Sequence, residues 1–261
     1  SFGSWIEDNC KHALVYTETA GCNSVVMEST ENYEGMIRAV AQSLCLFSSQ
    51  MCTSAQNIFI PNDGIMHNDT LVPYEKIVRD LIDTIEFYVS KPKIAAALCG
   101  CVMSPHTFQQ QKELRTLANE HNFPLLRDAT CYVHPDYPNA STATPMLVEV
   151  TIDDNEIYRQ EYFGPMAFII RAPNAHDALV QAAKDAQECG SISNYVYSQQ
   201  SEFLDLVEDT FFMAGASVGC NLITHLPINF AAAYSDYHVT GLNPAGNACL
   251  TDLAFVASRF R

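Results

Sequence analysis

Short apolar runs alternate with helical segments along most of the chain, and this alternation constrains the fold more than any other feature. The runs at 25–27, 58–60 and 168–170 are rich in β-branched and aromatic residues, as strands are. Between them lie segments such as 74–89, in which apolar residues recur every three or four positions, as in helices. Strands that alternate with helices form a mostly parallel sheet covered by helices on both faces. The pattern therefore predicts one compact α/β domain with a mostly parallel sheet.

The same periodicities predict further elements. We expect helices at 1–12, 32–47, 107–122, 176–188 and 202–213. We expect strands at 15–17, 132–133, 146–150, 195–197, 216–220 and 255–257. The spacing of apolar residues in 93–103 fits either a strand or a helix. Residues 221–247 are predicted to be mostly loop.

Charge and cysteine content disfavour several classes of function. The chain has 30 acidic and 14 basic residues, a net charge of −16, whereas nucleic-acid binding needs clustered Lys and Arg. No apolar run reaches the ~20 residues of a membrane span, and no signal peptide opens the chain. Ten cysteines in 261 residues are too dilute for a disulfide framework, and Cys99 and Cys101 form C-x-C, not the C-x-x-C of zinc sites. We expect a cytoplasmic protein with reduced thiols and no metal, membrane or nucleic-acid partner.

Cys52 is the first candidate for chemistry. It follows an apolar helical run that ends near Phe47, and its neighbours Gln50, Thr53 and Ser54 are polar. A thiol at the end of a helix, beside polar backbone groups, is a candidate nucleophile. Most cysteines only pack, so this position alone leaves the structural interpretation open.

Two acidic turns accompany this cysteine. Glu18, in YTETAG, ends a predicted strand before a glycine turn, where a carboxylate can reach a cavity but is more often solvated. Glu161 opens the segment EYFGP, residues 161–165, in which a turn follows the acid and an aromatic residue. Each turn is a weak signal by itself. Their combination with Cys52 is much more specific.

The three elements together resemble the aldehyde dehydrogenase superfamily. In that family a glutamate in an E-x-x-G turn precedes a G-Q-x-C nucleophile, as Glu18 precedes Cys52, and an E-x-F-G-P segment follows well downstream. The stretches ETAGCNSVVMEST, SSQMCTSAQNIFIP and DYHVTGLNPAGNACLTDLAFVASRF are similar to the PaaN-type enzymes of phenylacetate degradation. The resemblance runs from Phe2 to Arg261 and implies the aldehyde dehydrogenase catalytic domain, with its three α/β/α layers.

The resemblance also implies a mechanism. Cys52 would attack an aldehyde carbon, hydride would pass to NAD or NADP, and Glu18 would activate the water that hydrolyses the resulting thioester. Glu161 and Phe163 would position the nicotinamide ribose and ring. The backbone N–H of Cys52 would help to hold the oxyanion, together with a family asparagine that lies upstream of this chain. The expected product is a free carboxylic acid.

Substrate and domain organisation follow from the same resemblance. Asn221 and Phe230 fall where the family lines its substrate tunnel, and the PaaN branch implies a semialdehyde carried on CoA. Residues 1–17 would be the end of a nicotinamide-binding domain, and residues 18–261 the catalytic domain with its C-terminal oligomerisation segment cut short. We therefore expect a homo-oligomer, and an isolated chain that does not oxidise aldehydes because most of its cofactor site is absent.

The chain departs from the family motifs at a few positions. The family's E-L-G-G-K reads ETAGC here, so Cys22 stands at the lysine position, and Ser49 stands at the glycine before Gln50. These departures leave the nucleophile and the base intact, so the expected chemistry does not change.

Other functions stay open. A CoA-acylating enzyme would pass the thioester to CoA, but such enzymes usually lack the general base, so Glu18 favours hydrolysis. A non-catalytic binding or assembly domain is disfavoured by the intact Cys52 and Glu18. A cysteine hydrolase would pair Cys52 with His225 or His238, but no hydrolase motif surrounds Cys52. The eight histidines include no H-x-x-x-H or H-E-x-x-H pair, which disfavours a metal site.

Overall fold

The computed structural model describes residues 2–19, 21–224 and 241–247, and its centre is a seven-stranded sheet. The strand order is β10-β9-β1-β3-β8-β7-β6, and neighbours run parallel except β6 and β7, which are antiparallel. The strands are β1 Ser24–Met27, β3 Asn57–Pro61, β6 Leu125–Arg127, β7 Met146–Thr151, β8 Met166–Ala172, β9 Asn194–Tyr197 and β10 Val218–Cys220. The mostly parallel sheet predicted from the sequence is confirmed.

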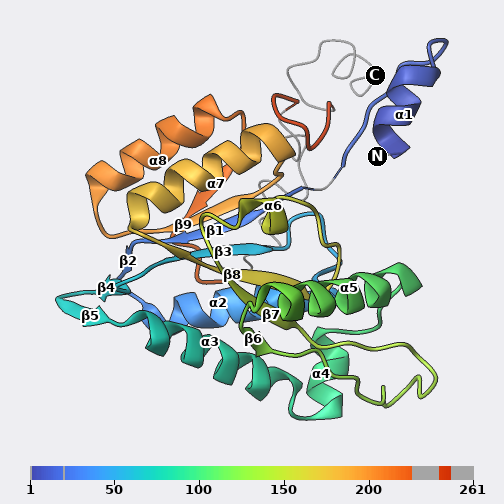
Figure 1. Cartoon of the computed structure of the whole chain (residues 1–261), viewed down its shortest axis with the longest axis horizontal. Coiled ribbons are helices and arrows are strands. Elements are labelled where there is room, and N and C mark those ends of the chain that lie inside the picture. Colours follow the sequence, from blue (N-terminus) through green and yellow to red (C-terminus); the bar gives the residue numbers. More distant parts are fainter. Residues whose placement is uncertain (1, 20, 225–240, 248–261) are drawn as a thin grey trace.

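Helices cover both faces of this sheet. The helices of the described residues are α1 Phe2–Asn9, which lies apart from the sheet, and α2 Tyr33–Cys45, α3 Tyr74–Val89, α4 Pro92–Leu98, α5 Pro105–His121, α6 Asn155–Tyr158, α7 Ala175–Cys189 and α8 Ser201–Met213, with a 3-10 turn η1 Leu46–Ser49 after α2. Figure 1 shows α7 and α8 on one face and α2, α3 and α4 on the other. The three-layer α/β/α architecture is therefore confirmed.

Two apolar cores lie on the two faces of the sheet. Alternate residues of a strand point to opposite faces, so Val25 packs in the core under α2 and α3 while Val26 packs in the core under α7 and α8. The same division holds in β8, where Ile169 and Ile170 lie in different cores. Because both faces are covered, β8 is apolar at nearly every position, as expected for a central parallel strand.

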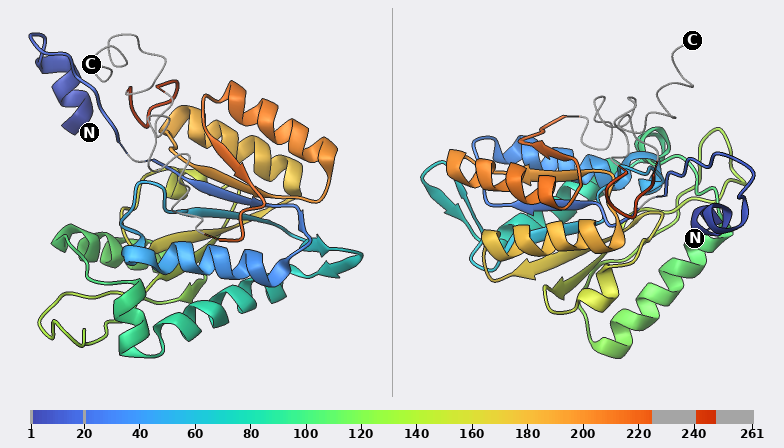
Figure 2. Two further views of the ribbon diagram at one scale, coloured as in Figure 1. Left: turned by 180° about the vertical axis from the view of Figure 1, so that it is seen from behind. Right: turned by 90° about the horizontal axis from the view of Figure 1, so that it is seen from above.

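The first helix stands apart from the layered body (Figures 1 and 2). No residue of α1 is buried, and the stacked rings of Phe2 and Trp5 are 73% and 57% exposed. Glu7 connects the helix to the body by accepting hydrogen bonds from Thr17 and, at 3.0 Å, from Asn247. The helix predicted at 1–12 is thus confirmed in a shorter form.

Two predicted strands are wrong, for a shared reason. At 15–17 the N–H of Thr17 donates to the side chain of Asn247 at 2.7 Å, and no neighbouring strand pairs with this segment in the described part of the chain. At 132–133 the backbone N–H of Tyr132 donates to the hydroxyl of Thr142 at 3.0 Å. In both segments a polar side chain, rather than another strand, takes up the backbone donor, so an apolar run remains irregular.

Other elements differ in extent from the sequence prediction. The ambiguous segment 93–103 forms the helix α4, which begins with a proline at its first turn, and then an irregular stretch. Three short strands, β2 Ser29–Thr30, β4 Ile65–His67 and β5 Thr70–Val72, form a small second sheet that was not predicted. The short β6 and α6 were also missed. These elements are too short to display a period.

The remaining predicted helices and central strands are confirmed within a few residues at each end. The strand predicted at 255–257 lies outside the described residues. Within the described residues, none of the helices combines the length and the apolarity that crossing a membrane would require.

Candidate active site

Three loops meet at the amino-terminal edge of the parallel sheet, just before β1, β3 and β8. They line a narrow pocket of about 20 Å3, room for roughly one water molecule. Cys52 comes from the loop before β3, and Glu161 and Phe163 come from the loop before β8. The structure therefore brings three of the residues singled out from the sequence to one place. The other lining residues are Gly21, Asn23, Ser49, Met51, Ser54, Ala55, Gln56, Tyr162, Gly164 and Met166.

The loop before β3 begins with three consecutive residues in the left-handed region. Phe47, Ser48 and Ser49 have φ values of 50°, 52° and 51°. For residues other than glycine, this conformation costs roughly 1–2 kcal/mol each. Hydrogen bonds hold the turn in place, since the hydroxyls of Ser48 and Ser49 donate to the carbonyl oxygens of Cys99 at 3.0 Å and Leu44 at 2.7 Å. The chain thus turns sharply out of α2 just before the candidate nucleophile.

Gln50 ties the same loop to the segment after α4. Its side-chain nitrogen donates to the carbonyl oxygens of Phe47 at 2.8 Å and Cys101 at 2.9 Å. Its side-chain oxygen accepts from the N–H of Met103 at 2.8 Å. The backbone of the C-x-C segment therefore supports the loop that carries Cys52.

Asn23 fixes the backbone at Cys52 itself. This side chain is 2% exposed, and its nitrogen donates to the carbonyl oxygens of Cys52 at 2.6 Å and Ser54 at 3.0 Å. Its oxygen accepts from the N–H groups of Ile192 at 3.0 Å and Ser193 at 3.1 Å. One buried amide thus joins the nucleophile loop to the turn before β9.

Glu18 approaches this pocket through the backbone around Ala245. Glu18 forms an isolated antiparallel bridge with Gly246, and the N–H of Thr19 donates to the carbonyl of Ala245 at 2.5 Å. Cys52 packs on the small apolar cluster to which Ala245 belongs. The backbone of Glu18 is therefore anchored beside a segment that contacts Cys52, although Glu18 is not among the residues that line the pocket.

The turn that carries Glu161 and Phe163 presents a carboxylate and an aromatic ring at the pocket edge. Glu161 is exposed, yet the surrounding protein removes part of its water, and this desolvation raises the pKa of its carboxyl. Phe163 is 42% exposed. Gly164 has a φ of 153°, and a Cβ atom there would lie 2.4 Å from the methyl group of Thr107, so the turn requires glycine.

Gly21 and Ser54 form part of the pocket wall. A Cβ atom at Gly21 would lie 2.0 Å from the carbonyl oxygen of Gly190, so only glycine permits this close approach. The hydroxyl of Ser54 is buried and has no hydrogen-bond partner among the described residues. A buried polar group without a partner is uncommon and indicates a place for a water molecule or a ligand.

An ion-pair cluster anchors the Glu161 turn to α7. Arg159 lies 2.8 Å from Asp185 and also pairs with Glu188. Asp185 is only 1% exposed, and burial raises its pKa to about 7. This turn is therefore held from the α7 side by a charged group that titrates near neutral pH.

The structure does not bring Asn221 to the pocket. Asn221 follows β10 at the carboxyl-terminal edge of the sheet, where its amide accepts from the N–H of Ser198 at 3.1 Å and donates to the carbonyl of Ser198 at 2.9 Å. Phe230, and the histidines His225 and His238 of the hydrolase alternative, lie outside the described residues.

None of the nine cysteines in the described ranges forms a disulfide. Burial raises the pKa of Cys22, and a hydrogen bond with Cys99, together with burial, raises the pKa of Cys45. Cys131 is exposed, whereas Cys52 is half-buried. Exposure alone thus favours Cys131, while the surrounding pocket favours Cys52. Among the same residues no three His, Cys, Asp or Glu side chains are grouped to hold a metal ion.

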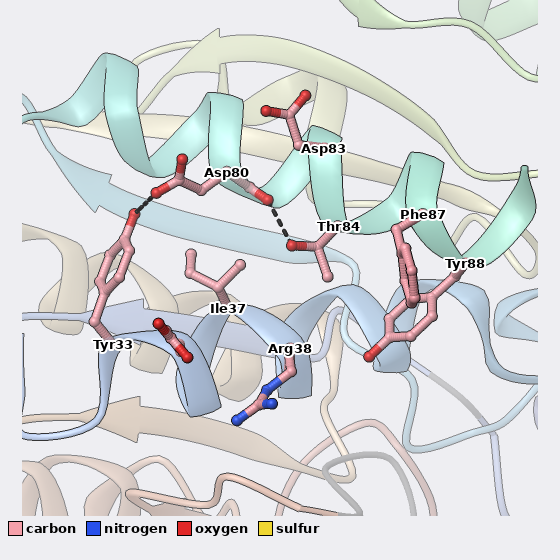
Figure 3. Close-up of a pocket in the computed structure, with 9 residues that line it drawn as sticks. Tyr33, Ile37, Arg38, Asp80, Asp83, Thr84, Phe87 and Tyr88 are labelled. Atoms are coloured by element: carbon pink, nitrogen blue, oxygen red, sulfur yellow. Dashed lines mark hydrogen bonds between the residues drawn. The ribbon is translucent and has the colours of Figure 1, made fainter.

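A larger hollow, of about 410 Å3, lies between α2 and α3. Figure 3 shows Tyr33 donating to the carboxylate of Asp80 at 2.7 Å and Thr84 donating to the carbonyl of Asp80, with Phe87 and Tyr88 at one end. Neither a cysteine nor any predicted site residue lines it. The size of a hollow therefore does not identify the candidate active site.

Sequence reasoning missed two amides that build the pocket, Asn23 and Gln56. Each comes immediately before the first residue of a central strand. A polar amide at the start of a buried strand has to be hydrogen-bonded inside the protein, and this was the signal that could have identified both.

Comparisons with known proteins bear on the family and the fold of the chain. Residues 2–226 match the Aldehyde dehydrogenase family. The crystal structure of an NAD-dependent aldehyde dehydrogenase from Burkholderia multivorans is 32% identical, with a TM-score of 0.90, and the match covers 99% of this chain and 46% of that chain. An NAD-dependent benzaldehyde dehydrogenase from Corynebacterium glutamicum shares the fold, with 16% identity and a TM-score of 0.64 over 87% of this chain and 46% of that one.

In a curated relative, too, the match covers less than half of the length. The N-succinylglutamate 5-semialdehyde dehydrogenase of Paraburkholderia xenovorans is 29% identical over 168 residues, which are 63% of this chain and 32% of the relative. The chain thus spans less than half the length of the proteins it matches.

Proposed function

Because this chain belongs to the aldehyde dehydrogenase family, we propose that it carries the catalytic half of an enzyme that oxidises an aldehyde to a carboxylic acid. The observation that supports this most is the pocket shared by Cys52, Glu161 and Phe163. We propose that residues 1–17 are the end of a nicotinamide-binding domain and that residues 18–261 are the catalytic domain.

In the proposed reaction, the Cys52 thiolate adds to the aldehyde carbon and forms a carbon–sulfur bond. The carbon then loses its hydrogen with the bonding electron pair and becomes the carbonyl of a thioester on Cys52. Bound NAD or NADP supplies the acceptor for that hydride. Glu18 takes a proton from water, which attacks the thioester, so that the carbon–sulfur bond breaks and the carboxylic acid leaves. The thiolate is thereby restored.

The residues at the pocket edge fit the nicotinamide end of such a cofactor. The carboxylate of Glu161 can accept hydrogen bonds from ribose hydroxyls, and the partly exposed ring of Phe163 can pack on a flat ring. The unpartnered hydroxyl of Ser54 offers one further polar contact. We propose that the pyrophosphate and the adenosine are held by a part of the enzyme outside this chain, since the relatives are more than twice as long.

The finer assignment rests on the sequence resemblance alone. The three stretches shared with PaaN-type enzymes support a semialdehyde carried on CoA, in phenylacetate degradation, as the substrate. A tunnel role for Asn221 and Phe230 stays a prediction, as do a homo-oligomer and a cytoplasmic location.

The test is aldehyde oxidation by the full-length gene product, followed as reduced nicotinamide with NAD and with NADP. We expect Cys52→Ala to abolish turnover and Cys131→Ala, which removes the exposed thiol, to leave it unchanged. Full activity of the Cys52→Ala protein would refute the proposed mechanism.

A further inference from the structure

The side chain of Gln56 joins the two segments on which the proposed chemistry depends. Gln56 lies at the end of the loop that carries Cys52, and it is 5% exposed. Its backbone is fixed, because its N–H donates to the carbonyl of Asn23 at 3.0 Å and its carbonyl accepts from the N–H of Phe168 at 2.9 Å. The side chain therefore extends from a rigid position beside the central strands.

The amide of Gln56 binds the backbone on both sides of Glu161. Its nitrogen donates to the carbonyl oxygens of Gln160 at 3.0 Å and Tyr158 at 3.1 Å, and its oxygen accepts from the N–H of Tyr162 at 2.8 Å. Gln160 and Tyr162 are the direct neighbours of Glu161. One buried side chain thus fixes the peptide units before and after this carboxylate.

The other anchors of this turn do not connect it to the Cys52 loop in the same way. Arg159 pairs with Asp185 and Glu188 of α7, so it ties the turn to that helix and not to the nucleophile loop. Asn57 donates to the carbonyl of Tyr158 at 3.1 Å, which lies before the turn. Only Gln56, among the side chains with described hydrogen bonds, holds both neighbours of Glu161 from the loop that carries Cys52.

We propose that Gln56 is a positioning residue that holds Glu161 and Phe163 in a fixed position relative to Cys52. This inference rests on the proposed function, in which a nicotinamide held by the Glu161 turn has to meet a carbon bound to Cys52. Reacting atoms need to lie about 3–3.5 Å apart, and a displacement of about 1 Å can cost roughly 100-fold in rate. In this role Gln56 acts through the backbone on both sides of Glu161.

The test compares Gln56→Met with the unchanged full-length gene product. Methionine keeps the length of the side chain but removes the partners of the Gln160 carbonyl oxygen and of the Tyr162 N–H group, while the carbonyl oxygen of Tyr158 keeps its bond from Asn57. We expect amide hydrogen exchange across 159–164 to accelerate about tenfold or more, because the turn opens more often. We expect KM for the nicotinamide cofactor to rise about fivefold or more, while alkylation of Cys52 by iodoacetamide stays within about twofold.

Two further variants keep the test decisive. Gln109→Met makes the same change at an exposed glutamine of α5, which bonds only to Glu113 in the described structure, and should leave all three measurements unchanged. Gln56→Glu keeps the acceptor for the Tyr162 N–H and removes the bonds donated to the carbonyl oxygens of Tyr158 and Gln160, so it should move exchange and KM in the same direction if the methionine variant does not fold.

The outcomes separate this inference from the proposed function. An unchanged cofactor KM despite faster exchange would show that Gln56 is only structural and would overturn the inference. A fall in Cys52 alkylation that parallels the rise in KM would also overturn it, because the effect would then act through the nucleophile loop. If the unchanged protein showed no oxidation dependent on Cys52, the proposed function itself would fail.

Discussion

The pocket around Cys52 and the hollow between α2 and α3 are built from different parts of the fold. Loops at the amino-terminal edge of the sheet form the small pocket, and buried amides such as Asn23 tie these loops together across long stretches of sequence. Two neighbouring helices form the much larger hollow, and its hydrogen bonds stay within α3 or join α3 to α2. A site for chemistry is thus recognised by how rigidly its backbone is held, rather than by its volume.

The two regions also differ in backbone strain. The Cys52 loop contains three residues other than glycine in the left-handed backbone conformation, Phe47, Ser48 and Ser49. By contrast, α2 and α3 are regular helices where they line the hollow. An unfavourable backbone conformation of this kind persists only where surrounding interactions stabilise it, and such conformations are concentrated at functional sites. A change at the pocket should therefore have a larger effect than a matched change at the hollow.

The largest effect is expected from Glu18→Gln in the full-length gene product. Without the general base, thioester hydrolysis should slow by about 10²–10⁴-fold, while acylation proceeds, so one equivalent of reduced nicotinamide should form in a burst. Stopped-flow absorbance measures both phases. Asp83→Asn removes an acid from the hollow and should leave the rate unchanged. A normal steady-state rate in the Glu18 variant would show that another group activates the water.

Asn23→Ala should be the most destabilising change in the pocket. It removes the bonds that Asn23 donates to the carbonyl oxygens of Cys52 and Ser54 and accepts from the N–H of Ile192, and we expect a loss of about 2–4 kcal/mol in the free energy of unfolding. Thr84→Val in the hollow removes one bond within α3 and should cost less than about 1 kcal/mol. Urea denaturation measures both. Equal losses would contradict the contrast between the regions.

Asp185→Asn tests the charged anchor behind the Glu161 turn. Burial raises the pKa of Asp185 to about 7, so the folded state binds its proton more tightly than the unfolded state does. The stability from this proton is complete below about pH 4 and is lost as the pH rises through about 7. As the pH rises over this window, the unchanged protein loses this stability and the variant does not. The unfolding free energy of the variant should therefore rise relative to that of the unchanged protein by about 1 kcal/mol per pH unit. A constant difference at pH 4.5, 5.5 and 6.5 would argue against a raised pKa.

The smallest effect is expected from Phe87→Ala in the hollow. Phe87 is 67% exposed, so its removal should change the unfolding free energy by less than about 0.5 kcal/mol and leave aldehyde oxidation unchanged. Thermal denaturation and a standard assay check both. A marked loss of activity would mean that the hollow, rather than the small pocket, takes part in the reaction.

The sequence predicted the layers, the central strands and the candidate nucleophile, because these have strong local signals. Runs such as 168–170 are apolar enough to be placed in a buried strand, and Cys52 and Glu161 lie in segments that resemble motifs of the aldehyde dehydrogenase family. The positions of Cys52, Glu161 and Phe163 around one pocket follow from the parallel order of the strands, which brings the preceding loops to one edge.

The missed features depend on partners far away in the sequence. Asn23 bonds to residues near 192, and Gln56 to residues near 160, so neither role is visible in a local window. The strand predicted at 132–133 fails because Thr142 supplies a side-chain acceptor where a neighbouring strand was expected. The left-handed turn at 47–49 contains no glycine, the residue that would have indicated this conformation in the sequence.

The most direct test of the central claim maps where an activated ester acylates this chain. A limiting amount of p-nitrophenyl acetate transfers an acetyl group to a reactive thiolate without any cofactor, and peptide mass spectrometry locates the group. We predict acetylation of Cys52 in its pocket, lost in Cys52→Ala and retained in Cys131→Ala. Acetylation of the exposed Cys131, with Cys52 unmodified, would contradict the assignment of Cys52 as the nucleophile.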